Sequence, residues 1–159
     1  RMNIRNARLL AGALAWFLAT STAAVAADTH QHAASEHAGL ALDHGHRWAT
    51  DAPLRQGMTA IRTALAARHE AIHHGSMSAA DFQALGSELE AQVASIVANC
   101  RLEPAADANL HLIIARLLAG AAAMQGHLGT APAAGAVQAI EALNDYGRYF
   151  DHPGWQPLG

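Results

Sequence analysis

The sequence predicts an all-α fold, an antiparallel up-down-up-down four-helix bundle preceded by a signal peptide and a flexible histidine-rich arm. Apolar residues recur at helical spacing through four segments, and no segment shows sustained strand-like alternation. The connections between these segments are only three to five residues long. Short connections place consecutive helices side by side in opposite directions, which favours this topology.

Residues 1–27 have the three parts of a signal peptide: an arginine-containing start, an apolar stretch from Leu9 to Ala19, and small residues before the cleavage site. Cleavage is expected after Ala26 or Ala27. The apolar stretch is short for a membrane anchor, because roughly 20 apolar residues are needed to cross a bilayer. We therefore expect a periplasmic or secreted protein with no membrane association after cleavage.

Residues 28–49 form the arm, which we expect to be disordered. It carries five histidines: His30, His32, His37, His44 and His46. Imidazoles at this density favour binding of transition metals, with copper the expected ion. Cleavage after Ala27 would also start the chain at Asp28-Thr29-His30, which resembles the amino-terminal motif that binds Cu(II) or Ni(II) through four nitrogens in a plane.

The first two bundle helices are expected at residues 51–74 and 78–100. Thr50 or Asp51 caps the first, and Ser78 with Asp81 forms a capping box at the second. Gly75 ends the first helix. The apolar stripes comprise Leu54, Met58, Ile61, Leu65 and Ile72, followed by Phe82, Leu85, Leu89, Val93, Ile96 and Cys100.

The other two helices are expected at residues 104–126 and 132–151, with Pro104 in the first turn of one and Pro153 after the end of the other. Their inward stripes comprise Leu110, Ile114, Leu117, Ala121 and Met124, then Val137, Ile140, Leu143, Gly147 and Phe150. The four helices make residues 50–159 one domain. The roughly 130 residues that remain after signal cleavage are enough for a single core.

This topology brings one end of each helix to a shared end of the bundle, which we call the floor: the starts of helices 51–74 and 104–126 and the ends of helices 78–100 and 132–151. Four candidate metal ligands fall at or near the floor: Met58, Cys100, His111 and His152. A thioether, a thiolate and two imidazoles suit copper, and sulfur favours Cu(I). Each has an ordinary alternative, namely core packing for the two sulfur residues and helix-end hydrogen bonding for the histidines.

The opposite end offers a second histidine cluster. His69 and His73 are four residues apart on one helical face, a chelating spacing, and His74, Met77, Met124 and His127 fall around the same end. Solvated histidines near a helix end are the competing interpretation.

Composition argues against several function classes. The chain has no lysine, and after signal cleavage seven arginines face thirteen acidic residues, so it lacks the basic surface of a nucleic-acid-binding protein. An enzyme is not expected, because Cys100 lies at a helix C-terminus, where the dipole disfavours a thiolate nucleophile. Covalent haem is excluded, since no C-x-x-C-H occurs. Non-covalent haem b held by Met58 and His111 ranks third among the alternatives.

Three segments carry a family resemblance: Arg47-Trp48-Ala49-Thr50-Asp51, Val97-Ala98-Asn99-Cys100, and Tyr146 to Trp155. With them, residues 46 to 158 resemble a family of small exported bacterial proteins labelled DnrO. The resemblance implies export and a helical domain, and it implies no activity. The histidine-rich arm lies outside it.

The sequence therefore predicts a periplasmic copper-binding protein for storage, transfer or resistance, with the metal and another periplasmic protein as partners. The alternative is a metal-free structural or stress-related binding protein.

Overall fold

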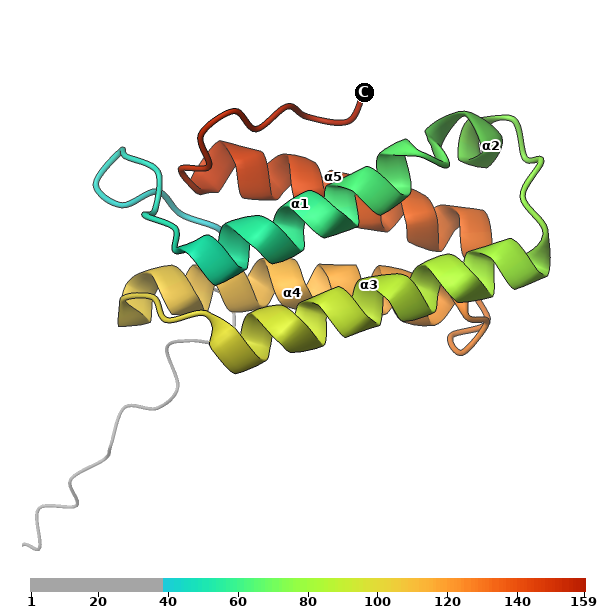
Figure 1. Ribbon diagram of the computed structural model, residues 1–159, viewed down its shortest axis with the longest axis horizontal. Helices are drawn as coiled ribbons and strands as arrows, with labels where there is room; N and C mark the ends of the chain where they lie inside the picture. The colour runs from blue at the N-terminus through green and yellow to red at the C-terminus, as the bar shows by residue number, and fades with distance from the viewer. Residues whose placement is uncertain (1–38) are drawn as a thin grey trace, which may run out of the picture. The chain divides into compact units, whose positions relative to one another are not determined.

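A computed structural model describes residues 39–159 and shows an all-α domain (Figure 1). Its elements are α1 (Ala52–Ala66), α2 (His69–His73), α3 (Ala79–Asn99), α4 (Pro104–Met124) and α5 (Pro132–Tyr149). Within the described range, pairing of strand type is limited to isolated bridges, Asp43 with His46 and Trp48 with Phe150. The all-α prediction is thus confirmed for this range. The predicted signal peptide and the arm histidines His30, His32 and His37 lie outside it.

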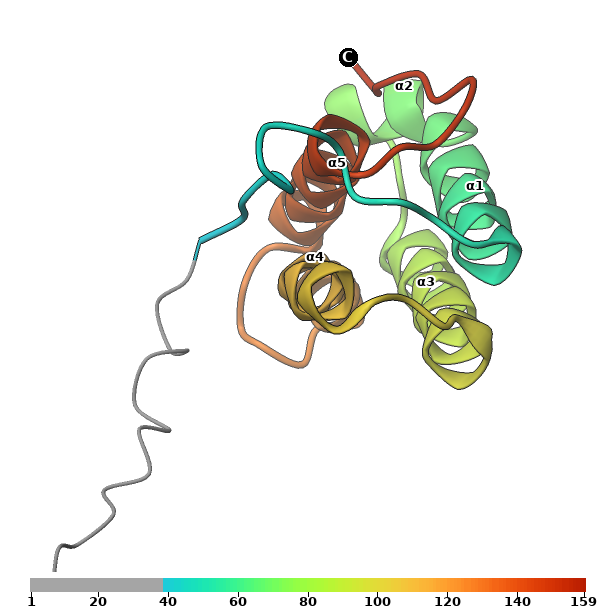
Figure 2. The same ribbon diagram turned by 90° about the vertical axis from the view of Figure 1, so that its left-hand side faces the viewer.

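The four long helices lie side by side, and neighbours run in opposite directions (Figure 1). Helix α1 packs on α3, α3 on α4, and α4 on α5, while α1 and α5 touch less. Seen end-on, α1 and α4 occupy opposite corners of the helical bundle (Figure 2). This arrangement decides which side chains can face one another across the core.

Local capping chemistry fixes the helix starts that the sequence indicates. Asp51 caps α1, its side chain accepting from the backbone N–H of Leu54 at 2.9 Å. Ser78 and Asp81 form the predicted capping box at α3. The Ser78 hydroxyl and the Ser78 backbone N–H both donate to the Asp81 carboxylate, at 2.7 and 3.1 Å, and these two hydrogen bonds lower the pKa of the Asp81 carboxyl. Prolines occupy the first turns of α4 and α5, where their missing N–H costs nothing.

The structure differs from the predicted helix 51–74, because a turn at Ala67 and Arg68 separates α1 from α2. Neither residue is a proline or glycine, so no local breaker marks the position. The Arg68 guanidinium donates to the Ala64 carbonyl at 3.0 Å and pairs with Glu88 of α3 at 3.3 Å. The chain therefore leaves the helix where this side chain binds both its own helix and a neighbour.

Helices α4 and α5 pack closely because glycines face each other. A Cβ added at Gly120 would lie 2.6 Å from the Gly135 carbonyl oxygen, and one added at Gly135 would lie 2.6 Å from that of Gly120. Both separations are too short for a side chain, so the two backbones approach to a distance that only glycine permits. The surrounding core is apolar, and Tyr146 and Phe150 are its largest fully buried side chains.

The floor is held together by backbone pairing between distant segments. Trp48 donates to the Tyr149 carbonyl at 2.8 Å and accepts from the Asp151 N–H at 2.8 Å. The Thr50 hydroxyl donates to the Asp151 carbonyl at 2.6 Å. The start of α1 is thus attached to the end of α5.

Residues 39–49, which the sequence predicts as part of a disordered arm, are hydrogen-bonded to the bundle. The Ala41 N–H donates to the Asn109 side chain of α4 at 2.9 Å, and the Trp48 indole donates to the Ala41 carbonyl at 2.7 Å. Asp43 and His46 exchange backbone hydrogen bonds across a tight turn in which His44 and Gly45 have positive φ. The Trp48 indole therefore ties this segment to itself, whereas the Asn109 side chain and the backbone of Trp48 attach the segment to the bundle, which composition alone does not reveal.

The C-terminal tail after α5 returns over α5 and α1. Asn144 of α5 exchanges two hydrogen bonds with the backbone of Leu158, at 2.8 and 2.9 Å. Arg62 of α1 donates to the Gln156 carbonyl at 2.5 Å. The tail therefore connects α1 and α5, two neighbouring helices that make few direct contacts with each other.

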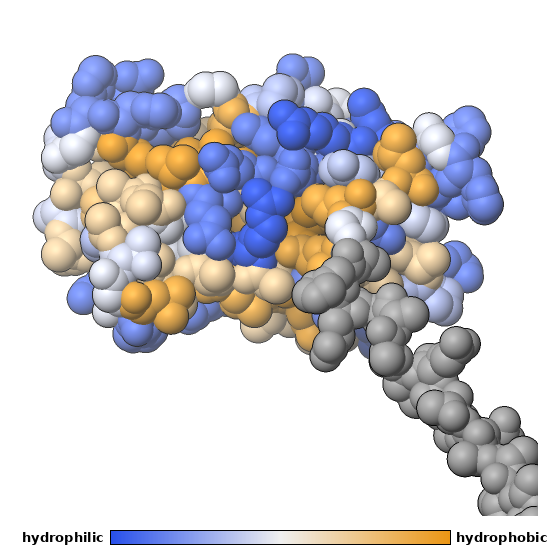
Figure 3. All heavy atoms as spheres, turned by 180° about the vertical axis from the view of Figure 1, so that it is seen from behind, coloured by the Kyte–Doolittle hydropathy of each residue, from blue (hydrophilic) through white to orange (hydrophobic). Residues whose placement is uncertain are grey.

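Helix α4 is long and apolar enough to cross a membrane by length and composition alone. Its buried residues pack against α3 and α5, and a core helix meets the same criterion, so no membrane assignment follows. On the face shown in Figure 3, hydrophobic patches are separated by hydrophilic side chains.

Candidate functional site

Met58 and Cys100, the two sulfur residues of the predicted floor site, are core residues. Met58 has no exposed surface, and Cys100 caps the end of α3 with 9% exposure. Burial raises the pKa of the Cys100 thiol, and the nearby carboxylates of Asp51 and Asp107 raise this pKa further. The thiolate that a nucleophile requires is therefore disfavoured at neutral pH.

His111 lies on the outer surface of α4, with its side chain 61% exposed. Its Nδ1 is 2.8 Å from the Asp107 carbonyl oxygen and 3.4 Å from the Asp107 carboxylate, one helical turn earlier. His111 lies on the outer surface of α4 whereas Met58 of α1 is enclosed in the core, and the two helices occupy opposite corners of the bundle, so the structure does not bring these side chains together. The geometry matches the helix-surface hydrogen bond that the sequence offers as the alternative.

His152 is half-buried just after α5, and both of its ring nitrogens face protein groups. Nδ1 is 3.0 Å from the Tyr146 hydroxyl, and Nε2 is 3.4 Å from the Thr59 hydroxyl of α1. Burial lowers the pKa of His152, and the positive charge of Arg55 lowers this pKa further. A neutral ring that accepts from Tyr146 and points Nε2–H toward Thr59 satisfies both contacts.

Aromatic rings surround this histidine. Trp155 lies against His152 and Tyr146, with ring centroids 4.9 Å away in each case, and Tyr146 stacks on Phe150 at 5.3 Å. Gly147 permits this packing, because a Cβ there would overlap the Trp155 indole. Burial raises the pKa of the Tyr146 hydroxyl, so it remains a hydrogen-bond donor. Sequence reasoning places His152 at the floor, but it misses the Tyr146 hydroxyl as the partner of this ring.

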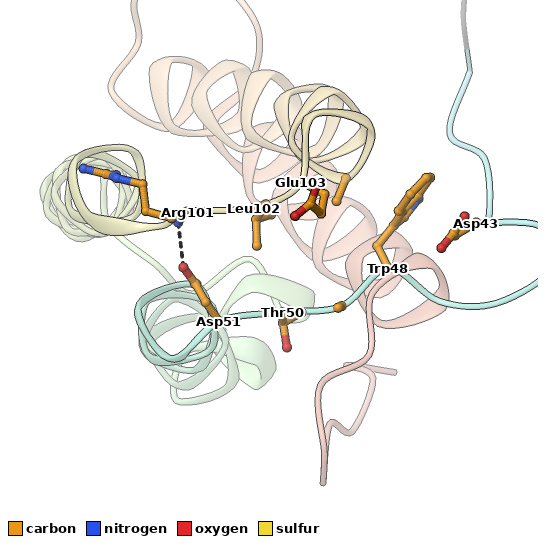
Figure 4. A pocket seen from close by; sticks show the side chains of 9 residues that line it. Asp43, Trp48, Thr50, Asp51, Arg101, Leu102 and Glu103 are labelled. Atoms are coloured by element: carbon orange, nitrogen blue, oxygen red, sulfur yellow. Dashed lines mark hydrogen bonds between the residues drawn. The ribbon is translucent and has the colours of Figure 1, made fainter.

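A pocket of about 260 Å³ opens at the floor between residues 43–51 and the connection from α3 to α4 (Figure 4). Trp48, Leu102 and Ala106 provide its apolar lining, and the carboxylates of Asp43 and Glu103 lie at its margin. The pocket thus combines an aromatic wall with negative charge, a setting suited to a small cationic or polar guest.

The polar groups deepest in this pocket have structural partners. Asp51 accepts from the Leu54 N–H through one carboxylate oxygen and from the Arg101 N–H, at 2.6 Å, through the other. The Arg101 guanidinium points away from the pocket (Figure 4) and donates to the carbonyls of Ala98 and Cys100. The pocket therefore offers a bound molecule an apolar surface and negative charge. Among the residues described as lining it, no nucleophile is paired with a base.

His44 and His46 are the arm histidines that the structure describes, and both are exposed. The His44 side chain is 97% exposed, and its Nε2 is 3.9 Å from the Asp43 carboxylate. Their rings extend from the turn at the edge of the domain, where solvent ions reach them freely.

At the end opposite the floor, His69 and His73 of α2 place their Nε2 atoms 3.0 Å apart. His74 instead lies 3.2 Å from the Glu70 carboxylate. Across residues 39–159, no three side chains of His, Cys, Asp or Glu gather closely enough to hold a metal ion. The structure therefore brings together two imidazoles here, and it does not gather the predicted floor ligands into one cluster.

Comparison with known proteins leaves these sites to be interpreted from their own chemistry. No protein-family model, curated protein or solved structure matches this chain.

Proposed function

We propose that this chain is an exported, periplasmic protein that binds a transition metal, copper in particular, through the histidines of its arm, for storage, transfer or resistance. The observation that carries the proposal is the concentration of His30, His32, His37, His44 and His46 in one short segment. Imidazole is a preferred ligand of copper, nickel and zinc, and copper binds most tightly among the divalent ions of this series.

In this proposal, the helical bundle is the folded domain to which the metal-binding arm is attached. We propose an up-down four-helix topology, with α2 as a continuation of the first helix beyond the turn at Arg68. The fixed turn at residues 43–46 supports this role, because it holds His44 and His46 beside the domain while leaving both exposed.

The floor residues are not part of this proposal. Met58 is enclosed by the core, Cys100 is buried at the end of α3, and both ring nitrogens of His152 contact protein groups. Non-covalent haem also lacks a supporting observation, because Met58 is enclosed by the core whereas the His111 side chain is exposed on the surface of α4. The resemblance to DnrO-labelled proteins supports export and a helical domain, and it supports no particular activity.

The test is a titration of the exported full chain with Cu(I) and Cu(II), after mass spectrometry has identified its N-terminal residue. The decisive variant replaces the five arm histidines by glutamine, and a matched control replaces the arm acids Asp28 and Glu36 by Asn and Gln. We expect the histidine variant to lose the tightest copper equivalents and the acid variant to keep them. Equal copper binding by the histidine variant and the unaltered chain would refute the proposal.

A metal-free binding protein is the second candidate, and the floor pocket is the observation that favours it. The Trp48 ring at its wall provides the assay, because a guest entering the pocket would change indole fluorescence. Saturable quenching by a small organic cation, abolished by a Glu103→Gln/Asp43→Asn variant, would support this candidate. No tight copper binding by the unaltered chain would make it the better account.

A further inference from the structure

The two imidazoles of α2 form a pre-arranged pair. Their Nε2 atoms are 3.0 Å apart, and the ring centroids lie 4.3 Å apart with the planes inclined at 65°. We propose that His69 and His73 form a two-nitrogen site for a divalent transition metal, preferentially Cu(II), separate from the arm and at the opposite end of the bundle from the floor.

The separation of the two nitrogens matches a chelated metal. Metal–imidazole bonds are about 2.0 Å long, so two of them reaching nitrogens 3.0 Å apart enclose an angle of about 97° at the metal. Adjacent ligands in a square plane enclose about 90°, whereas tetrahedral ligands enclose about 109°. The pair is therefore closer to the tetragonal geometry of Cu(II) or Ni(II) than to the tetrahedral geometry of Zn²⁺.

The backbone holds this pair in place. Ile72, between the two histidines, is 5% exposed and anchors α2 in the core. The turn before α2 is fixed by the Arg68 contacts with Ala64 and Glu88, and the turn after it by the Ser76 N–H, which donates to the Ala71 carbonyl at 3.0 Å. The backbone therefore already holds the two nitrogens close together, and rotation of the rings would direct both lone pairs at one metal ion.

The neighbouring charged groups leave the pair free for a cation. Glu70 is directed to His74, so its carboxylate is not bound to either ring of the pair. In the neutral pair, one ring donates its Nε2–H to the Nε2 of the other. Binding of a metal ion by both Nε2 atoms requires the donor ring to take the tautomer with its proton on Nδ1, which leaves both Nε2 lone pairs for the metal. Water would fill the remaining positions, since no third protein ligand of the His, Cys, Asp or Glu type lies close by in the described range.

The experiment uses the full chain with the five arm histidines replaced by glutamine, so that arm binding does not obscure the pair. Into this background we would introduce His69→Gln, His73→Gln or His74→Gln and titrate Cu(II), following the visible absorption band and the nitrogen splitting in the electron paramagnetic resonance spectrum. His74 is the matched control, because it is an exposed histidine on the same short helix whose ring faces Glu70. Circular dichroism checks that each variant is folded.

We expect about one Cu(II) equivalent with splitting from two nitrogens, and an apparent Kd that rises about tenfold or more in His69→Gln and in His73→Gln, because the second ring binds as an intramolecular ligand. His74→Gln should leave the Kd unchanged. The same Kd in all three variants, or an equal loss in His74→Gln, would overturn the inference.

A chain with an intact arm and both His69→Gln and His73→Gln separates this inference from the proposed function. If copper binding is lost only when the arm histidines are replaced, the proposed function is supported and the site at His69 and His73 is refuted. If copper binding is lost only when His69 and His73 are replaced, that site is supported and the proposed function is refuted.

Discussion

Asp51 joins two parts of the floor, and its replacement tests whether this tie stabilises the bundle. One carboxylate oxygen caps α1 at the Leu54 N–H, 2.9 Å away, and the other accepts from the Arg101 N–H at 2.6 Å. Losing an N-cap side chain costs about 1 kcal/mol, and losing a partly exposed hydrogen bond costs about 1 kcal/mol more. Asp51→Ala should therefore lower the free energy of unfolding by about 2 kcal/mol.

Asp51→Ser separates the two contributions. A serine hydroxyl still caps α1, but it is too short to bind the Arg101 N–H at the same time, so the loss should be about 1 kcal/mol. Urea unfolding followed by circular dichroism at 222 nm measures both variants, with an unchanged slope showing that two-state unfolding is retained. If Asp51→Ser were as unstable as Asp51→Ala, the N-cap hydrogen bond would make no separate contribution to the free energy of unfolding. If both matched the unaltered protein, the assignment of Asp51 as a tie would be wrong.

Four further predictions concern packing and ionisation. Gly135→Ala should destabilise the domain by about 1 to 3 kcal/mol in urea unfolding, because its Cβ would overlap the Gly120 carbonyl. Tyr146→Phe keeps the buried ring but removes the hydroxyl from His152, which should cost about 1 kcal/mol and shift the NMR titration of that imidazole. The pKa of His152 is lowered on folding, so the unfolded chain binds more protons and the stability from this group should fall as pH drops below about 6.5. Cys100, whose thiol pKa is raised, should react with iodoacetamide more slowly in the folded protein than in urea at the same pH.

Each of these has a clear contrary result. Gly126→Ala serves as a comparison for Gly135→Ala, because a Cβ at Gly126 meets no neighbour and any loss there reports backbone strain alone. For Tyr146→Phe, an unchanged His152 titration would contradict the hydrogen bond. A His152→Gln variant should show a flatter stability profile between about pH 5 and 7.5, and an identical profile would remove His152 as the cause. Equal alkylation rates in folded and unfolded chain would show that Cys100 is not protected.

Much of the fold follows from local signals in the sequence. Asp51, Ser78 with Asp81, and the prolines at 104 and 132 mark helix starts, because capping and the missing proline N–H act within one turn. The turn at Arg68 was not predictable in this way, since it coincides with a side-chain contact to Glu88 on another helix.

The candidate sites were less accessible to sequence reasoning. Helical spacing places His69 and His73 on one face, but only the structure shows that their Nε2 atoms face each other. Spacing also groups His111 with Met58 by height along the bundle, although the two lie on helices at opposite corners. The position of a residue along the bundle axis follows from its number in the helix. Whether its side chain faces the core or the solvent depends on which helices pack together.

The sequence alone determines the helical character of residues 50–159, the capping of the helices and the concentration of histidine before them, because these depend on residue type and short-range spacing. The tertiary structure decides which polar groups are already occupied. His152 contacts Tyr146 and Thr59, burial raises the pKa of the Cys100 thiol, and residues 39–49 are attached to α4 through Asn109. Contacts between segments far apart in the chain, such as His152 with Thr59 and Ala41 with Asn109, contribute to these outcomes, and no local pattern records them.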